Sequence, residues 1–317
     1  MPSLYKSLAL LCGLSLVTTP AVAAEWQPDG PIRLLIGFGA GGGTDTQARA
    51  LVTELSEKEG WDIVPQNVPG AGGAVMAAQL KDEPADGLTL GLALNTTFTF
   101  PTPSNAGFGL EDFTFLTTTA ASQTGVLART DSGWTSLQDM VDAAKAGTRI
   151  VWTNYDPLTQ LASDVIADHY GIAVNNVMGS GGRSGVDSLV AQDANVAWGG
   201  GAQQALVEAG VLTILASAEN APLAQAPDQP TLEDLGMDYN FGFKFVLAAP
   251  AGLPEEARTA ITDAVAEILD DPQSETAQFI QRQYPPAPVV VSGTALEDEL
   301  SADRKSFEAL QAKFKAN

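Results

Sequence analysis

Short apolar runs alternate with segments of helical periodicity along most of the chain. Residues 32–36, 63–64 and 88–94 are predicted as buried strands. After the first of them, residues 48–55 place apolar side chains at i, i+3, i+4 and i+7, which predicts a helix packed against a sheet. A second helix is expected over 74–80. Strands alternating with helices of this length predict an α/β fold with a mainly parallel sheet.

The pattern changes after residue 110. Residues 113–119 and 124–129 form two extended segments, which we interpret as a crossover into a second domain. Strands and helices then alternate again, and residues 241–249 are expected to return to the first domain. Further strands are expected at 149–153, 174–178 and 212–217, and helices are expected to begin near Ser136, Asp156 and Gly185 and to cover 254–269 and 296–314.

The first 23 residues have the pattern of a secretory signal peptide. Lys6 precedes an apolar core at 8–17, and an A-x-A cleavage site follows at 21–23. We expect cleavage near Ala23, export to the periplasm and loss of Cys12, the one cysteine. The remaining chain is longer than one core usually covers. The predicted division is domain 1 over 24–122, domain 2 over 123–244, and a return to domain 1 over 245–317.

A glycine-rich turn joins the first strand to the first helix. Gly37, Gly39 and Gly42 match G-x-G-x-x-G, but the next strand ends on Gln66 and Asn67 rather than on the carboxylate that a dinucleotide requires. Glycines admit a ligand close to backbone amides, and a helix N-terminus favours negative charge. We therefore interpret the turn as an anion site; a tight turn without a ligand is the alternative. A capping box between the side chains at 44 and 47 is also expected.

Similar turns occur twice more, at 154–156 and 180–184, where a strand also ends on hydroxyl or glycine residues before a helix. Each turn alone is explained by ordinary capping, and a Ser184–Asp187 capping box is expected in the last one. Their distribution over both halves of the chain favours a cleft with facing anion sites, which suits a di- or tricarboxylate.

Charge and composition exclude several classes of function. With 16 Lys and Arg against 38 Asp and Glu, the net charge is −22, which disfavours nucleic acid and anionic lipid as partners. A saline habitat is another explanation for this excess. His169 is the one histidine, and metal-ligand clusters and nucleophile motifs are missing from the sequence. Asp45 caps the first helix or contacts a ligand. The pattern favours binding over catalysis, without a cofactor or metal.

The order of several motifs resembles the Bug family, the periplasmic receptors of tripartite tricarboxylate transporters. These motifs are P-I-R-L at 31–34, G-G-x-T-D at 41–45, P-G-A-G-G at 69–73, D-G-L-T-L at 86–90 and A-P-A-G-L-P at 249–254. The resemblance covers nearly all of the chain after the signal segment. It implies a two-domain periplasmic-binding-protein fold of type II, the venus-flytrap arrangement, with crossing hinge strands.

The resemblance also implies a ligand site. In this sequence the matching positions of the first loop are Phe38, Gly41, Gly42, Thr44 and Asp45, followed by Thr97 and by Gly181 and Gly182 in the second domain. Asn95, Gln123, Asn154, Thr159, Ser180 and Gly201 complete the candidate set. The chain departs from the family where Gly179 and Ser180 replace a Tyr-Lys pair, and Arg183 is the candidate replacement for the lost cation.

The function implied by the resemblance is capture of a small mono-, di- or tricarboxylate and its delivery to membrane permease subunits. The receptor is expected to be a monomer, to bind no nucleic acid and to perform no catalysis. Two alternatives stay open: a receptor that senses its ligand for a signalling partner, and a secreted α/β enzyme. Asp45→Ala and Gly42→Val are each expected to weaken binding.

Overall fold

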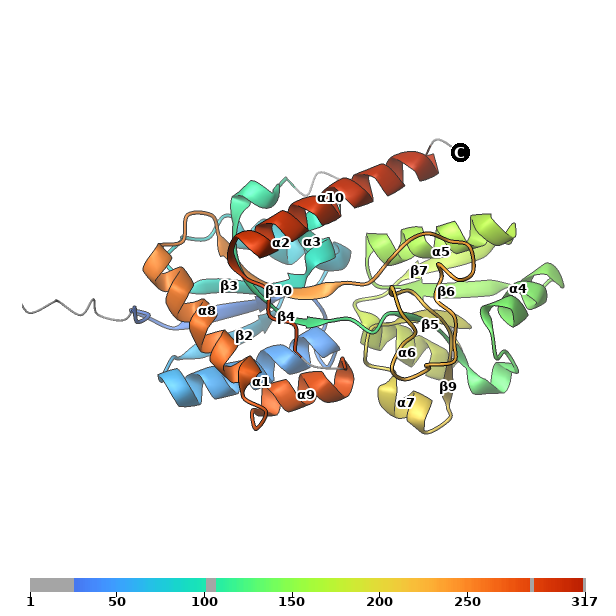
Figure 1. Ribbon diagram of the computed structural model, residues 1–317, viewed down its shortest axis with the longest axis horizontal. Helices are drawn as coiled ribbons and strands as arrows, with labels where there is room; N and C mark the ends of the chain where they lie inside the picture. Colours follow the sequence, from blue (N-terminus) through green and yellow to red (C-terminus); the bar gives the residue numbers. More distant parts are fainter. Residues whose placement is uncertain (1–25, 101–106, 286–287, 316–317) are drawn as a thin grey trace, which may run out of the picture.

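Two lobes, each built on a five-stranded sheet, make up the computed structural model, which describes residues 26–100, 107–285 and 288–315 (Figure 1). The expected signal segment and its cleavage site lie outside the described residues. The first sheet has the order β2 (Ile63–Asn67), β1 (Ile32–Ile36), β3 (Thr89–Leu94), β10 (Lys244–Pro250), β4 (Phe113–Ala121). The second has the order β7 (Val174–Met178), β6 (Ile150–Asn154), β8 (Val196–Gly199), β5 (Gly125–Arg129), β9 (Leu212–Ser217).

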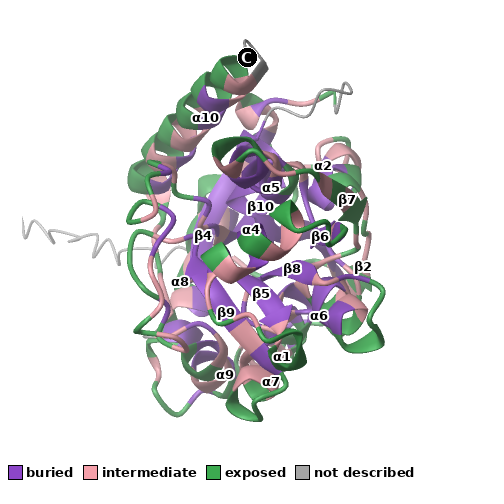
Figure 2. Cartoon of the chain, turned by 90° about the vertical axis from the view of Figure 1, so that its right-hand side faces the viewer, coloured by how far each residue is buried: buried purple, intermediate pink, exposed green. Residues whose placement is uncertain are grey.

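Helices cover both sheets and bury most of the strands, whereas the edge strands β2 and β7 stay partly exposed (Figure 2). In the first lobe these are α1 (Gly43–Glu59), α2 (Ala74–Leu80), α3 (Asn95–Thr99), α8 (Glu255–Asp270), α9 (Glu275–Gln283) and α10 (Gly293–Lys315). In the second lobe they are α4 (Leu137–Lys145), α5 (Pro157–Tyr170), α6 (Gly182–Ala191) and α7 (Gln204–Glu208). Short 3₁₀ turns η1 (Ala71–Gly73), η2 (Leu110–Asp112) and η3 (Thr130–Ser132) complete the elements. The α/β prediction is confirmed.

One strand in each sheet runs against its neighbours. β10 pairs antiparallel with β3 and β4, and β5 pairs antiparallel with β8 and β9. These two strands follow the segments that connect the lobes. The Ser122 amide donates to the Phe243 carbonyl at 2.8 Å, and the Phe243 amide donates to Ser122 Oγ at 2.9 Å. The crossing segments are therefore hydrogen-bonded to each other, which confirms the expected crossing hinge strands of the type II fold.

Several local predictions are confirmed and others are wrong. Ser136 and Asp156 cap α4 and α5 as expected, each with a reciprocal bond from the third helical residue. The capping box over 44–47 does not form, because Gln47 is buried and accepts instead from Thr119. Nor does the Ser184–Asp187 box form, since α6 begins at Gly182, three residues before the expected start. The residues 95–97 form the first turn of α3.

The ends of the parallel strands determine where a ligand can bind. β1 leads through the loop of residues 37–42 into α1, and β7 leads through a shorter loop into α6, so both helix N-termini lie at carboxyl edges of their sheets. In open α/β sheets this edge is the usual ligand site. In Figure 1 the two edges face each other across the gap between the lobes, beside the crossing segments.

Candidate functional site

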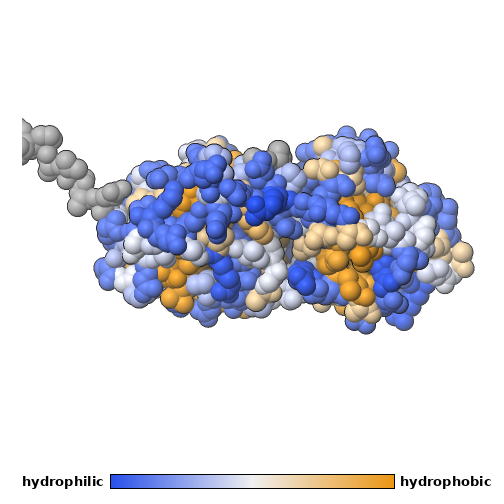
Figure 3. Space-filling view, turned by 90° about the horizontal axis from the view of Figure 1, so that it is seen from below, coloured by the Kyte–Doolittle hydropathy of each residue, from blue (hydrophilic) through white to orange (hydrophobic). Residues whose placement is uncertain are grey.

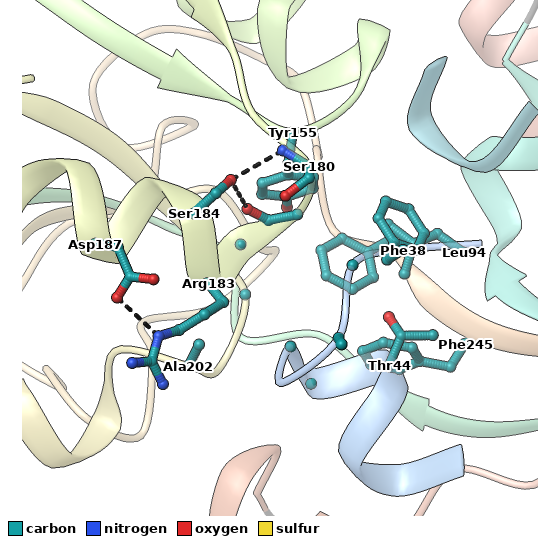
Figure 4. A pocket seen from close by; sticks show the side chains of 18 of the residues that line it. Phe38, Thr44, Leu94, Tyr155, Ser180, Arg183, Ser184, Asp187, Ala202 and Phe245 are labelled. Carbon is teal, nitrogen blue, oxygen red and sulfur yellow. Dashed lines mark hydrogen bonds and ion pairs between the residues drawn. The ribbon is translucent and has the colours of Figure 1, made fainter. Parts of the chain in front are cut away.

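A pocket lies between the lobes and is lined by residues from both (Figure 4). Its lining comprises Phe38, Gly39, Ala40, Gly42, Gly43, Thr44, Leu94, Tyr155, Ser180, Gly181, Gly182, Arg183, Ser184, Asp187, Gly200, Ala202, Phe243, Phe245 and Tyr284. The cavity volume is about 130 Å³, against the roughly 10–15 Å³ that one water requires. The pocket therefore accepts a small solute.

The first wall is the loop of residues 37–42 between β1 and α1, and its glycines have structural causes. Gly41 has φ of +75°, which an L side chain rarely adopts. A Cβ atom on Gly43 would lie 1.7 Å from the hydroxyl oxygen of Tyr284. The loop and the start of α1 can therefore take this shape only with glycine at these positions, and Tyr284 is free to pack against the backbone.

Asp45 holds this loop from behind rather than facing the pocket. One carboxylate oxygen accepts from the Gly41 amide at 2.9 Å, and the other accepts from Arg49 Nε and Asn67 Nδ2, both at 2.9 Å. Asn67 also donates to the Phe38 carbonyl at 3.0 Å. The Asp45 residue is only 4% exposed. This network, with the buried Asp45 carboxylate at its centre, fixes the backbone that forms the first wall.

The first backbone amides of α1 are available to a ligand. Gly42 is the N-cap residue, and within the described chain no side chain caps its helix. Gly43 and Thr44, the first two helical residues, line the pocket. An α-helix leaves its first amides without partners inside the helix, and they carry the positive end of its dipole. The start of α1 is thus an anion site that is open to the pocket.

The second wall repeats this arrangement in the other lobe. Gly181 is the N-cap residue of α6, again without a side-chain cap among the described residues, and Gly182 lines the pocket. Ser184 accepts from the Ser180 amide at 3.0 Å and donates to the Gly181 carbonyl at 2.7 Å. These bonds shape the β7–α6 loop and leave the helix N-terminus uncovered. The N-termini of α1, a helix of 17 residues, and of α6, a helix of 10 residues, therefore open into one pocket.

The lobes are in direct contact around the pocket. The Gly39 amide donates to the Ser180 carbonyl at 3.2 Å, and Thr96 Oγ1 donates to an Asp156 carboxylate oxygen at 2.9 Å. Gln283 also donates to the Gly201 carbonyl. Described residues from opposite lobes thus hydrogen-bond directly beside the pocket, and the structure represents a closed arrangement.

Aromatic side chains from the hinge and from α9 complete the pocket. Phe243 stacks edge-on against both Tyr155 and Phe245, with ring centroids 5.9 Å and 5.4 Å away, and Phe245 packs against Tyr284 at 5.0 Å. Burial raises the pKa of the Tyr155 and Tyr284 hydroxyls well above their usual value. Both phenols therefore stay neutral, so they are hydrogen-bond donors or acceptors rather than anions.

The charged side chains of the lining neutralise each other. Arg183 Nε donates to Asp187 at 2.8 Å, and both side chains are more than half exposed (Figure 4). Arg183 therefore points its charge along α6 instead of supplying an unopposed cation. In residues 26–100, 107–285 and 288–315, no group of His, Cys, Asp and Glu is arranged to hold a metal ion.

The structure brings six of the predicted site residues to the pocket and places the others elsewhere. Those at the pocket are Phe38, Gly42, Thr44, Ser180, Gly181 and Gly182. Gly41 and Asp45 brace the first loop from outside. Gly201 packs against Tyr284, and Gln123 donates to the Pro285 carbonyl beside the crossing segments.

The remaining four predicted residues use their side chains inside the protein. Asn95 donates to Asp303, Thr97 donates to the Gly72 carbonyl, Asn154 accepts from Trp198, and Thr159 completes the cap of α5. The sequence reasoning missed the aromatic lining, namely Tyr155, Phe243, Phe245 and Tyr284. Periodicity cannot separate these residues from core residues, and no helix was predicted over α9, which ends beside Tyr284.

Two uncapped helix N-termini that meet in a small closed pocket between hinged lobes define a solute-binding receptor. The family model "Tripartite tricarboxylate transporter family receptor" matches residues 47–282, so the chain belongs to this family. It is 26% identical over 283 residues to the "UPF0065 protein in gbd 5'region" of Cupriavidus necator, covering 87% of this chain and 86% of that protein. The family consists of receptors rather than enzymes.

Solved structures show the same fold. The structure of the periplasmic binding protein BugD superposes with a TM-score of 0.81 at 19% identity, covering 90% of this chain and 98% of that one. R. palustris Rpa4515 with adipate gives a TM-score of 0.79 at 22% identity, covering 89% and 96%. These similarities show the fold, and the family assigns the chain to the periplasm. No described helix is both long and apolar enough to cross a membrane.

Proposed function

We propose that this receptor captures a small organic acid in the pocket between its lobes and delivers it to the permease subunits of a tripartite transporter. The observation that carries the ligand class is the pair of uncapped helix N-termini, α1 and α6, at one pocket. Backbone amides at such ends bind carboxylates well. The acid bound to the similar R. palustris protein supports the same class.

Binding by backbone dipoles suits this protein's charge. With a net charge of −22, the surface repels anions at long range, so affinity has to come from short contacts inside the closed pocket. Closure removes water, and each amide then interacts more strongly with a carboxylate because the surrounding dielectric is lower. Phe38, Gly42, Thr44, Ser180, Gly181 and Gly182 are the proposed contact residues.

The proposal includes a division of the chain into two domains that move relative to each other. We take residues 24–122 with 245–317 as domain 1 and 123–244 as domain 2, because the sheet changes between Ala121 and Gly125 and changes back before Lys244. Opening at the crossing segments would then expose the pocket. We further propose that the exported receptor acts as a monomer after cleavage near Ala23.

Calorimetric titration of the chain from residue 24 tests the ligand class. The protein is refolded to remove carried-over ligand and titrated with mono-, di- and tricarboxylates. We expect micromolar or tighter binding of at least one acid, and weaker binding in Gly42→Val, because the new Cβ would lie 3.3 Å from the Gly39 carbonyl oxygen and crowd the loop that presents the α1 amides. Thr53→Val, on the exposed side of α1, is the matched control. A folded protein that binds none of the acids would refute the proposal.

A further inference from the structure

The two lobes meet at a narrowing of the molecule (Figure 3), and a carboxylate from the second lobe lies at the hinge. Glu219 follows the last residue of β9 by two positions and reaches the first crossing segment. Its Oε1 atom accepts from Ser122 Oγ at 2.5 Å and from the Thr124 amide at 2.8 Å. Both donors are uncharged, so hydrogen bonds rather than an ion pair hold Glu219 in this position.

The same carboxylate also reaches the second crossing segment. A Cβ atom on Gly242 would lie 2.0 Å from Glu219 Oε2, so the carboxylate occupies the space that a side chain would need there. The preceding residue, Ala218, donates its amide to the Thr124 carbonyl at 2.9 Å and accepts from the Phe241 amide at 2.9 Å. Glu219 and its neighbour therefore bridge the two crossing segments.

Hydrogen bonds continue from the hinge to the ligand pocket. The Thr124 hydroxyl donates to Ser122 Oγ at 2.9 Å, and the Thr124 side chain is a hydrogen-bond partner of the Tyr155 phenol. Tyr155 lines the pocket, and Ser122 Oγ also accepts from the Phe243 amide at 2.9 Å. One connected network thus runs from a side chain of the pocket through both crossing segments to Glu219.

This network crosses the boundary between the two proposed domains. Ser122 belongs to domain 1, whereas Thr124 and Glu219 belong to domain 2, so rotation at the crossing segments would change the distance between Ser122 and Glu219. Burial raises the pKa of the Glu219 carboxyl group, and its hydrogen bonds with Ser122 and Thr124 oppose the rise. A carboxylate shielded from water depends more on its protein donors than an exposed one does.

We propose that Glu219 is a hinge-positioning residue whose hydrogen bond with Ser122 stabilises the closed receptor and, through Thr124 and Tyr155, links closure to the occupancy of the pocket. This inference rests on the proposed function, because it takes a bound acid to favour closure. Loss of the bond lowers the fraction of receptor that is closed. The apparent affinity then falls by the same factor for every acid, since no ligand contact has changed.

The test titrates Glu219→Ala, Glu219→Gln and wild type with the same mono-, di- and tricarboxylates. Glu219→Ala should weaken each acid that wild type binds by a similar factor, about ten- to a hundredfold, as expected for a lost hydrogen bond to a charged group. Glu219→Gln keeps an acceptor oxygen and should retain more of the affinity. Stopped-flow kinetics should place the loss in faster dissociation, because the acid leaves when the lobes open. Glu233→Ala, exposed on the same lobe, is the matched control.

Gly242→Ala is a second, independent variant. Its Cβ would displace the Glu219 carboxylate, so it should weaken binding by itself but add little in the Glu219→Ala background. Thermal melts of all variants check folding. Unchanged affinity in Glu219→Ala, unequal factors for different acids, or strictly additive effects of the two substitutions would overturn the inference and leave the proposed function standing. A folded wild type that binds none of the acids would overturn both.

Discussion

The β1–α1 loop and the β7–α6 loop share a design but differ in how firmly they are held. Both place a glycine at the N-cap of a helix whose first amides lack a side-chain cap in the described structure. Behind the first loop, the buried Asp45 and the half-buried Asn67 form a network that fixes the backbone. The second loop relies on the Ser184 hydroxyl, and its residues are largely exposed or half-buried.

This difference suggests separate tasks for the two loops. A rigid loop with preorganised amides suits the group that every acid ligand has in common, one carboxylate, because no ordering cost accompanies binding. A lightly held loop can differ in shape and in side chains without loss of the fold, so it suits recognition of the part in which ligands differ. We therefore expect substitutions at the first loop to weaken the binding of every acid and substitutions in the second to change which acid is preferred.

The largest effect is expected from Gly43→Ala. The new Cβ would lie 1.7 Å from the Tyr284 hydroxyl oxygen, and Tyr284 is buried against Phe245, so α1 or Tyr284 must move. Overpacking of this kind costs about 1–3 kcal/mol. Binding of the acid found by calorimetry should fall at least about thirtyfold, and the melting temperature should fall as well.

A double mutant identifies the cause of that loss. Tyr284→Phe removes the nearest atom and leaves ring carbon Cζ at 3.0 Å, so Gly43→Ala with Tyr284→Phe should recover part of the stability. Gly41→Ala is the control within the same loop: its Cβ has nothing within 4 Å, and the cost is confined to the positive φ, about 1–2 kcal/mol. Strictly additive effects of the Gly43 and Tyr284 substitutions would contradict the steric explanation.

Asp45→Ala should have the next largest effect. It leaves the Gly41 amide without its acceptor and separates Arg49 from its ion-pair partner. The expected loss of stability is about 1.5–3 kcal/mol, the usual contribution of a hydrogen bond to a charged group, because the Asp45 carboxylate is buried although Gly41 is exposed. Affinity should fall about tenfold, because the loop loses its fixed shape, not a ligand contact. Asp45→Asn, which keeps one acceptor oxygen, should retain more affinity than Asp45→Ala, and equal losses would refute this explanation.

The second lobe has its own buried carboxylate, but without a cation beside it. Asp156 accepts from Thr159 and, across the cleft, from Thr96. Burial raises the pKa of this carboxyl group above its usual value, and the hydrogen bonds oppose the rise. The folded state therefore keeps the proton longer than the unfolded chain does, and the stability due to Asp156 is present at low pH and declines as pH rises through the raised pKa.

Asp156→Asn tests this pH dependence. Asparagine is also a good N-cap, and it does not titrate, so the variant lacks the decline. Its melting temperature minus that of wild type should increase between pH 4 and pH 8, by about 2–4 °C for each kcal/mol. Other titrating groups are common to both proteins and cancel in the difference. Parallel pH profiles would show that Asp156 does not carry the effect.

The sequence predicted the fold well, because the strands are continuous apolar runs between clear turn signals. The glycine-rich β1–α1 and β7–α6 loops were located for the same reason. The aromatic side chains of the pocket were not located. Phe243 precedes β10 and Phe245 lies in it, within an apolar stretch typical of core, and Tyr284 lies about 240 residues beyond the first loop. Residues this far apart in sequence become neighbours only in the folded protein, so local sequence patterns do not predict their contact.

Asp45 illustrates a second limit. Its position in the first turn of a helix suits both a cap and a ligand contact, and the sequence left both open. The structure places its carboxylate on Gly41, Arg49 and Asn67, behind the loop. Which way a side chain points depends on partners from other elements, here Asn67 at the end of β2. The spacing of residues in the sequence locates the loop, but the role of Asp45 depends on its tertiary contacts.

The smallest effect is expected at Arg183, and it tests the lightly held loop directly. The Arg183–Asp187 ion pair is more than half exposed on both sides, and such pairs contribute about 0–1 kcal/mol. Arg183→Ala should therefore change affinity less than about threefold. Asp187→Asn frees the guanidinium and should strengthen diacid binding about two- to threefold at low salt, with the gain lost near 1 M salt because surface charges are then screened. A large loss in Arg183→Ala would mean that the cation, rather than the α6 amides, holds the part of the ligand at the second loop. The two loops would then differ in charge rather than in rigidity.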